Sequence, residues 1–553
     1  MARHNMKTVR PVYPSPEAPE IDRRRYELPL TAMTVTGVIR ARAEVTPEAG
    51  LVRIRDRWLT YSEALSQSER VAAALTAAGL GKGDFCGQFM STRMEFIANY
   101  LAMSRLGVIM APINTAYRGY LLEYVLGDTG CRLLFTEPDL LDRIAAAEPK
   151  LEVLDTVVVL PGIETPLPEF KRIRLLTYEE FLAAGSRMAT PAVEVTHRDA
   201  NCIIYTSGTT GPSKGVLLSN SHAVSKALEV SEICRMGADD VIYSPLPLFH
   251  SMALQRGVLA AVVMGASVVL RDRFSATAYW DDVRAVGATV GHCVFSIPVI
   301  LKKAPPSARD RDNPLRCMYN AAYDAEFEER FGVKLIEGYG MTEANTALYM
   351  RYDEQPRPGS CGKPNRDWEV RLVDEGDSEV PVGVVGEVTL RPRLPGRMML
   401  GYHNKLEATL EAWRGLWFHT GDLAVRDGEG YHYFRDRKKD AIRRRGENIS
   451  SWEVERILTD HPAILEAAAL PQPSDVGEDD LWVIVVPRPG ATLTPLQVLE
   501  FCEMRMPDFM IPRYIEVADE LLKTPTGRVE KYRLRERGPA PGAHDAGDRR
   551  RRR

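Results

Sequence analysis

Cysteine is scarce in this chain, with eight residues in 553, and none of them belongs to a C-x-x-C pair. Zinc modules and disulfide frameworks need closely and regularly spaced cysteines, so the sequence favours neither and indicates reduced thiols. Long apolar runs are also missing. The most apolar stretch, residues 257–270, is shorter than the ~20 residues of a membrane helix, and Arg256 and Arg271 flank it. We therefore expect no membrane span here, but a buried helix followed by a strand.

Neither sign of charge is in excess. Lysine and arginine number 71 and aspartate and glutamate 75, which gives a net charge of −4, so no overall positive field would gather nucleic acid or an anionic membrane. The basic stretch 437–445 is interrupted by Asp440 and contains no aromatic residue, and we expect no nucleic-acid partner. Residues 1–25 lack the apolar stretch of a signal peptide. These features together predict a cytoplasmic protein.

The length and the changing pattern along the chain predict at least two domains. In the first half, helical stretches alternate with short apolar runs, which is typical of parallel sheets covered by helices on both faces. After Gly359 short strands with tight turns predict a small antiparallel unit. We therefore predict an α/β fold with a large N-terminal domain over residues 1–435, a smaller α+β domain over 436–538, and a disordered basic tail over 539–553. The apolar runs expected to form strands include residues 133–136, 156–160, 202–205 and 268–270.

The most informative stretch is a loop at residues 205–215, which reads YTSGTTGPSKG and lies between two apolar runs. Glycines let backbone N–H groups approach an oxyanion, hydroxyl side chains add donors, and Lys214 adds positive charge. A plain surface loop is the alternative, but the density of donors favours phosphate binding. The residues expected to bind phosphate are Thr206, Ser207, Gly208, Thr209, Thr210, Gly211 and Lys214.

This loop is not a Walker A motif. That motif has glycine directly before the lysine and serine or threonine after it, whereas this chain has Ser213 and Gly215. The loop also joins two predicted strands rather than a strand and a helix. A P-loop nucleotide hydrolase is therefore disfavoured.

Five stretches in a fixed order resemble the signature motifs of the adenylate-forming superfamily, which includes acyl-CoA synthetases, adenylation domains and luciferases. Besides the loop just described they are GYGMTE, TGD, DRKKD and KTPTGR, at residues 338–343, 420–422, 436–440 and 523–528. The resemblance covers about residues 34–536. The stretch RRRGENISS at 443–451 is most similar to the crotonobetaine/carnitine-CoA ligase-like branch.

The resemblance implies an acid–thiol ligase that uses ATP, Mg²⁺ and coenzyme A. A carboxylate attacks the α-phosphorus of ATP to give an acyl-adenylate and pyrophosphate, and a thiol then displaces AMP. The implied partners are a small-molecule carboxylic acid and coenzyme A; a homodimer stays open, and so does the identity of the acid. The alternatives are an enzyme that loads the phosphopantetheine of a carrier protein, a nucleotide-binding protein with impaired adenylation, and a luciferase-like oxygenase, for which the sequence gives no positive sign.

The resemblance also assigns the ATP-binding residues. Glu343 would ligate Mg²⁺, Thr342 would donate to a phosphate, and Tyr339 would offer an aromatic face to adenine. Taken alone, residues 339–343 would more often form a turn that enters a helix capped by Thr342. The other residues assigned to this stretch and to the adenine loop are Gly340, Met341, Asn320, Ala321 and Ala322.

Further assignments concern the ribose, the second domain and the acyl side. Asp422 would accept both ribose hydroxyls, since one carboxylate has two oxygens for two vicinal donors, and Arg437 would add a second contact. Lys439 corresponds to a hinge about which a mobile C-terminal domain rotates. Gly446, followed by Glu447, would line the channel for pantetheine. His250 would face the acyl substrate, although a histidine after an apolar run is by itself more often structural.

One departure from the family pattern concerns the catalytic cation. Relatives usually carry a lysine after the glycine of the last motif, where it reaches the substrate carboxylate and the α-phosphate, whereas this chain has Arg528. Arginine keeps the charge and can bind two oxyanions through its planar fork, but it is bulkier. Three possibilities stay open: Arg528 does this work, Lys523 or Lys531 replaces it, or adenylation is impaired.

Overall fold

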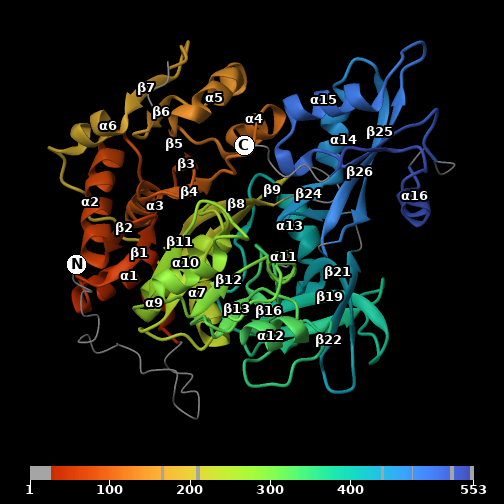
Figure 1. Cartoon of the computed structure of the whole chain (residues 1–553). Helices are drawn as coiled ribbons and strands as arrows, with labels where there is room; N and C mark the ends of the chain where they lie inside the picture. Colours follow the sequence, from red (N-terminus) through yellow and green to blue (C-terminus); the bar gives the residue numbers. More distant parts are fainter. Residues whose placement is uncertain are drawn as a thin grey trace.

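The computed structural model describes residues 27–547, except for 163–166, 207–211, 295, 438–440, 476 and 523–528. A large N-terminal domain and a smaller C-terminal domain lie side by side (Figure 1). Several predicted residues lie outside the described part of the chain, namely Ser207, Gly208, Thr209, Thr210, Gly211, Lys439, Lys523 and Arg528. Among the described residues, no helix combines the length and the apolar character that crossing a membrane requires.

The first large sheet of the N-terminal domain has eight strands. From β8 to β7 the strands run parallel, while β9 and β20 add an antiparallel edge. Strands such as β4 and β5 are buried at every residue, as expected for a parallel sheet covered on both faces. In spatial order the strands are β20 (Gly401–Tyr402), β9 (Lys214–Ser219), β8 (Ala200–Thr206), β4 (Ile109–Pro112), β3 (Phe85–Phe89), β5 (Leu133–Thr136), β6 (Thr156–Val159) and β7 (Arg174–Thr177).

The second large sheet has seven strands and is parallel except for β2, which pairs antiparallel with β1. The apolar stretch 257–270 forms the buried helix α9 (Leu259–Met264) and strand β11, as the sequence predicts. In spatial order the strands are β14 (Lys334–Ile336), β13 (Cys317–Tyr319), β12 (Val290–His292), β10 (Val241–Ser244), β11 (Ser267–Leu270), β1 (Gly50–Ile54) and β2 (Arg57–Thr60).

Helices cover both sheets. α3 and α7 are buried on nearly every side, which marks them as helices enclosed between other layers rather than helices on the surface. α2 begins with a capping box in which the Thr60 and Glu63 side chains satisfy each other's backbone N–H groups. The helices of this domain are α1 (Val35–Val45), α2 (Tyr61–Ala77), α3 (Met94–Leu106), α4 (Tyr120–Thr129), α5 (Leu141–Ala147), α6 (Tyr178–Gly185), α7 (Asn220–Ile233), α8 (Ser251–Ala253), α10 (Tyr279–Val286), α11 (Ser296–Lys302), α12 (Ala325–Phe331) and α13 (Leu406–Ala412).

Two antiparallel units complete the N-terminal domain. The four-stranded unit, in the order β18-β19-β21-β22, is the one that the sequence after Gly359 predicts, and a three-stranded sheet in the order β15-β16-β17 holds residues of the GYGMTE motif. Residues 341–343 form no helix, so the reading of this motif as a turn into a helix is wrong. The strands are β18 (Trp368–Val373), β19 (Val385–Pro392), β21 (Phe418–Arg426), β22 (His432–Arg437), β15 (Gly338–Gly340), β16 (Thr346–Tyr349) and β17 (Lys363–Pro364).

The C-terminal domain combines a hairpin, a four-stranded sheet and three helices. Along β26 the side chains alternate, because Leu481, Val483 and Val485 join a core that includes Leu121 of the N-terminal domain, whereas the intervening residues face the opposite side. The elements are β23 (Ala441–Arg444), β24 (Glu447–Ser450), β25 (Ile464–Pro473), β26 (Asp479–Pro487), β27 (Tyr514–Val517), β28 (His544–Asp545), α14 (Ser451–Thr459), α15 (Pro495–Arg505) and α16 (Lys531–Arg537).

One part of the predicted tail is ordered. β28 pairs antiparallel with β27, and Asp545 forms an ion pair with Arg513. The described residues 539–547 thus fold back onto the C-terminal sheet, and the prediction of a disordered tail over this part is wrong. The prediction from composition failed because glycine, proline and alanine are typical of irregular segments, and an edge strand of two residues has no pattern of its own among them.

Candidate active site

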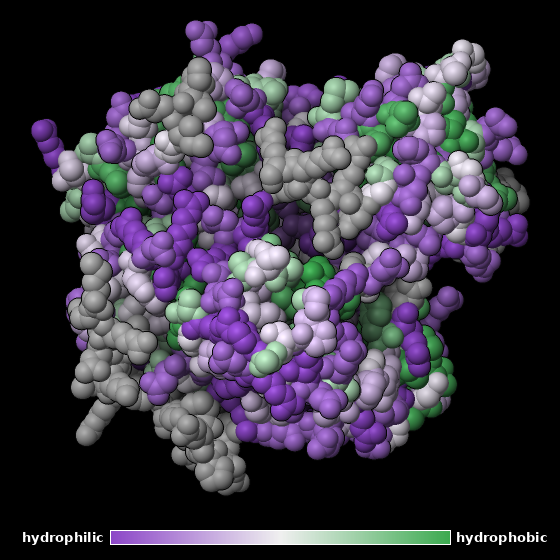
Figure 2. Space-filling view, in the orientation of Figure 1, coloured by the Kyte–Doolittle hydropathy of each residue, from purple (hydrophilic) through white to green (hydrophobic). Residues whose placement is uncertain are grey.

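A cavity of about 1670 Å³ lies between the two domains. Figure 2 shows a hollow at the centre of the visible face, with apolar side chains gathered beside it and hydrophilic ones over most of the surrounding surface. Loops and strand ends from both domains line the cavity, so that motifs far apart in the sequence meet there. The predicted residues that line it are Thr206, Lys214, His250, Asn320, Gly340, Met341, Thr342, Glu343, Asp422, Gly446 and Glu447.

Other predicted residues stay outside this lining. Ala321 is fully buried behind Asn320, which adopts a left-handed backbone conformation with φ of 69°. Tyr339 does not line the cavity but contacts a residue that does. The others that do not line it are Ala322 and Lys531.

The loop at residues 205–215, called the phosphate loop below after its predicted role, connects two antiparallel strands, as the sequence predicts. β8 and β9 pair so that Thr206 lies opposite Lys214, which fixes both ends of the loop at the cavity. At the end of the loop, the backbone N–H and the hydroxyl of Ser213 donate to one carboxylate oxygen of Glu453, at 2.9 and 2.5 Å. Glu453 lies on α14, so the C-terminal domain holds the base of this loop.

Glu343 lies in a small polar cluster with Tyr402 and Lys214. The Tyr402 hydroxyl donates to Glu343 Oε1 at 2.9 Å, and Lys214 Nζ lies 4.6 Å from the centre of the Tyr402 ring. Burial raises the pKa of the Tyr402 hydroxyl, and the charge of Glu343 raises it further. Tyr402 therefore stays a neutral donor that orients the Glu343 carboxylate beside the phosphate loop.

Asp422 and Tyr339 are brought together although 83 positions separate them. The Tyr339 hydroxyl donates to Asp422 Oδ2 at 2.7 Å, while the N–H of Asp422 donates to Thr420 Oγ1 at 3.1 Å. Gly421, with φ of 74°, provides the turn that aims this aspartate at the cavity. β21 and β22 also pair Asp422 with Arg437 in register, so the TGD and DRKKD motifs are neighbours in one sheet.

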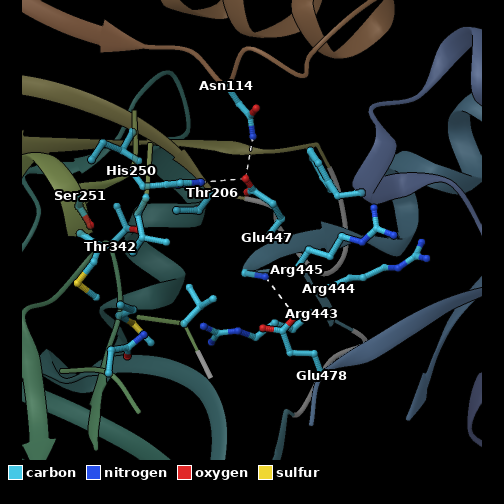
Figure 3. Close-up of a pocket in the computed structure, with 18 of the residues that line it drawn as sticks. Asn114, Thr206, His250, Ser251, Thr342, Arg443, Arg444, Arg445, Glu447 and Glu478 are labelled. Atoms are coloured by element: carbon cyan, nitrogen blue, oxygen red, sulfur yellow. Dashed lines mark hydrogen bonds and ion pairs between the residues drawn. The ribbon is translucent and has the colours of Figure 1, made fainter. Parts of the chain in front are cut away.

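A three-way contact joins the two domains at the cavity. Glu447 of the C-terminal domain accepts a hydrogen bond from Asn114 Nδ2 at 3.0 Å and lies 2.9 Å from His250 Nε2 (Figure 3). Burial alone would lower the pKa of His250, but the charge and hydrogen bond of Glu447 outweigh it and raise the pKa above its ordinary value. His250 and Glu447 thus meet across the domain boundary, and the raised pKa of His250 favours its protonated form, which makes this contact an ion pair.

This pair predicts a pH-dependent contact. Because the folded-state pKa of His250 is raised, its contribution to domain docking is complete below the unfolded value of about 6.5 and is lost as the pH rises through the raised value. We expect Glu447→Gln to lower the pKa of His250, since burial then acts without a compensating charge. Histidine NMR titration of the two proteins, with His250→Asn to assign the signal, measures this. An unchanged titration in Glu447→Gln would contradict the contact.

The turn that carries Glu447 reaches into the cavity. Arg445 and Gly446 join β23 to β24 with φ of 55° and 79°, the two left-handed residues of a type I′ hairpin turn. A Cβ atom added to Gly446 would lie 3.0 Å from Cγ1 of Val294 in the N-terminal domain. The backbone N–H of Gly446 also donates to Glu478 at 3.3 Å. The glycine is required both by the turn and by the close approach of the other domain.

The residues around the last motif lie on the other side of the C-terminal domain. Leu521 and Val529, which flank residues 523–528, pack with Trp482 on the face of the sheet opposite the N-terminal domain. Lys531 forms an ion pair with Glu455 at 2.6 Å. The described residues on either side of this motif thus lie in a part of the domain that does not line the cavity.

Sequence reasoning missed several residues of the site. Asn114 is 333 positions from its partner Glu447, and Glu453 is 240 positions from Ser213. Neither belongs to a recognisable motif, and Tyr402 also lies between motifs rather than within one. Two of these contacts, Asn114–Glu447 and Ser213–Glu453, join the two domains and therefore depend on how the domains are placed.

The fold and the cavity define a two-domain α/β enzyme whose motif loops meet at the domain boundary. The profile of the family described as AMP-binding enzyme matches residues 39–403, and that of the AMP-binding enzyme C-terminal domain matches residues 453–528. This chain belongs to the AMP-binding enzyme family. The predicted resemblance to adenylate-forming enzymes is thereby confirmed.

Relatives match along nearly the whole chain. A probable CoA ligase from Humulus lupulus is 30% identical over 518 residues, which cover 90% of this chain and 95% of the relative. A crotonobetaine/carnitine–CoA ligase from Citrobacter koseri is 28% identical over 487 residues, covering 87% and 93%. Among solved structures, an o-succinylbenzoate CoA synthetase from Bacillus subtilis has a TM-score of 0.78 at 22% identity, covers 92% of this chain and 99% of that one, and shows the same fold.

Proposed function

We propose that this protein is an AMP-forming acid–thiol ligase, which activates a carboxylic acid with ATP and transfers the acyl group to coenzyme A. The observation that carries the proposal is the convergence of three separate motifs and the Gly446 hairpin on one cavity between the domains. The naming of the Humulus and Citrobacter relatives as CoA ligases supports it.

In the first step the acid carboxylate attacks the α-phosphorus of ATP, pyrophosphate leaves, and an acyl-adenylate forms. Negative charge grows on phosphate oxygens, so fixed donors and cations lower the barrier. Thr206 and Lys214, at the two ends of the phosphate loop, supply a hydroxyl and a positive charge at the cavity. Asp422 would hold the ribose, with its carboxylate oriented by the Tyr339 hydroxyl.

The site suits one Mg²⁺ ion brought in with the nucleotide. Mg²⁺ usually binds through one or two carboxylates and the substrate phosphates rather than through an all-protein cage. Glu343 fits this role for two reasons. It lines the cavity beside Lys214, and its second carboxylate oxygen takes no part in the hydrogen bond from Tyr402.

In the second step the thiol attacks the acyl carbonyl and AMP leaves. The arrangement in the structure suits this step, because the backbone around Gly446 forms a narrow wall against Val294 while Glu447 and His250 lie at the same opening. The thiol must lose a proton as it attacks, and the Glu447–His250 pair lines the same cavity. We assign the described conformation to thioester formation.

The first step requires a different placement of the C-terminal domain. The residues that flank the last motif lie on the sheet face opposite the N-terminal domain, so a rotation is needed before Arg528, Lys523 or Lys531 can reach the substrate carboxylate. A hinge at Lys439, between β22 and β23, would allow it. Lys531 would first have to leave its ion pair with Glu455.

The function is tested by pyrophosphate release from the purified protein supplied with ATP, Mg²⁺ and a panel of carboxylic acids. Release that requires an added acid, followed by mass-spectrometric detection of an acyl-CoA, supports the ligase. A thioester formed on a phosphopantetheinylated carrier protein but not on coenzyme A would favour the alternative acceptor. Binding of ATP without acid-dependent pyrophosphate release would instead indicate a nucleotide-binding protein.

Asp422→Ala is expected to weaken nucleotide binding. Removing a carboxylate that accepts hydrogen bonds costs about 1.5–3 kcal/mol per bond, so the KM for ATP should rise roughly 10- to 100-fold. The KM for the acid should change little, because the ribose lies apart from the acyl group. Steady-state kinetics with each substrate varied in turn measures both values, and equal changes in both would contradict the assignment.

A further inference from the structure

The inner wall of the cavity contains a buried arginine that the activation chemistry does not use. Arg256 lines the cavity although only 6% of its surface is exposed. It lies in a π-helical turn, Leu254–Val258, between α8 and α9. Such turns displace side chains from the regular helical positions and occur often at functional sites.

The contacts of Arg256 leave its charge uncompensated. Its one hydrogen bond is a long one of 3.4 Å to the Thr346 hydroxyl, and its buried Nε has no hydrogen-bond partner within the described part of the chain. No acidic side chain of the described residues forms an ion pair with it within 4.0 Å. A buried charge in this state is costly unless a ligand completes it.

Two further polar groups lie beside Arg256 on the wall of the cavity. Thr346 Oγ1 lies 2.8 Å from the Tyr319 hydroxyl, and both residues line the cavity while almost fully buried. Guanidinium, hydroxyl and phenol groups thus lie together on the inner wall. One of the two hydroxyls donates to the other, so the guanidinium and the remaining hydroxyl proton can donate to an anionic acceptor.

The residues behind this wall do not neutralise it. The nearby Glu229 uses both carboxylate oxygens on other donors, the Thr346 N–H and Asn365, and burial raises its pKa to about 7. Burial, aided by the charge of Arg256, lowers the pKa of Lys226 to about 7 and that of His292 to about 3. Arg256 itself keeps its charge, because an arginine side chain stays protonated, although it interacts electrostatically with Glu229.

We propose that Arg256, with Thr346 and Tyr319, binds a second anionic group of the acid that this enzyme activates, so that its substrates are dicarboxylic acids or acids with an equivalent distal anion. The inference rests on the proposed function. His250 lies at the N-cap of α8 and Arg256 in the π-helical turn that follows this helix, and both line the cavity. A short carbon chain can therefore join one acidic group near His250 to a second one at Arg256.

The test compares acids of equal length that differ only at the far end. Succinate, glutarate and adipate are set against butyrate, valerate and hexanoate, with γ-aminobutyrate as the cationic counterpart of succinate, all by pyrophosphate release. We expect kcat/KM to be on the order of 10² higher for the best diacid than for its monoacid partner, because a site built to bond a polar group rejects analogues that lack it. γ-Aminobutyrate should be the poorest substrate.

The variant Arg256→Met should reverse this preference. Loss of one partner of a buried charge pair should lower kcat/KM for the diacid roughly 100-fold, while the monoacid is used equally well or better. Arg256→Lys keeps the charge without the planar fork and should retain part of the preference. Arg132→Gln, which removes a half-exposed arginine paired with Asp155 far from the cavity, is the matched control and should behave as the parent enzyme.

The outcomes separate this inference from the proposed function. If monoacids are activated as well as diacids, or if Arg256→Met slows both kinds of acid equally while the Tm and ATP binding stay normal, the inference is overturned and the ligase function stands. If no acid supports pyrophosphate release, the ligase function falls and the inference with it. If Arg256→Met fails to fold, the comparison of diacids with monoacids in the wild-type enzyme decides alone whether the inference holds.

Discussion

Replacing Gly446 with valine is expected to abolish most thioester formation and to leave acyl-adenylate formation close to its normal rate. The new Cβ would lie 3.0 Å from Val294, tighter than ordinary van der Waals contact, and the residue would keep a φ of 79° that β-branched side chains rarely adopt. Strain and overpacking of this kind cost about 1–3 kcal/mol each. Their combination predicts a loss of roughly 100-fold in the second step.

The adenylation step should escape this penalty because the contact with Val294 exists only when the hairpin lies in the cavity. Gly490→Val is a matched control in the same domain. Gly490 has φ of 80°, but a Cβ there would meet nothing within 4 Å, so the variant carries the backbone strain without the clash. Acyl-adenylate formation is followed by pyrophosphate release, and thioester formation by transfer from a supplied acyl-adenylate. Equal loss in the Gly446 and Gly490 variants would attribute the effect to domain stability instead.

The fold was predictable where local pattern and burial agree. The apolar runs at 133–136 and 268–270 became buried parallel strands within one residue of the expected bounds, because such strands must be apolar on both faces. The division of these strands between two sheets was not predictable. It depends on the connections through α2 and α7, which lead from one sheet to the other, and a helix such as α7 that is buried on nearly every side gives no sign of which sheet it covers.

The site was predictable only where a motif marks it. Lys214, Glu343 and Asp422 were named from the sequence and line the same cavity, yet Arg256 and Asn114 line it too and lie in stretches that resemble ordinary core. The sequence shows Arg256 only as a charge beside an apolar run. Its position on the inner wall follows from the π-helical turn and from the strand β16 that brings Thr346 to it, and neither has a signature in a single sequence.

The two steps also place opposite demands on the C-terminal domain. In the described arrangement Glu453 contacts the end of the phosphate loop, and Glu447 contacts His250 and Asn114. These contacts stabilise this placement of the domain. A rotation that brings the last motif to the cavity would give up all of these. The contacts must therefore be weak enough to break in each cycle, and hydrogen bonds that water can replace meet this condition better than a large apolar interface.

Arg528→Ala is expected to slow acyl-adenylate formation by roughly 10²–10³-fold, the usual effect of removing a group that stabilises transition-state charge. Transfer from a supplied acyl-adenylate should change less than about threefold, because the residues flanking this motif lie away from the cavity in the arrangement assigned to that step. Arg528→Lys should recover most of the loss, since it restores the point charge.

Lys523→Ala and Lys531→Ala are the matched comparisons. If Lys531→Ala instead causes the selective loss, the cation comes from α16, after release from Glu455. Equal slowing of both steps by Arg528→Ala would exclude a role confined to adenylation. It would also contradict the proposal that the two faces of the C-terminal domain serve different steps.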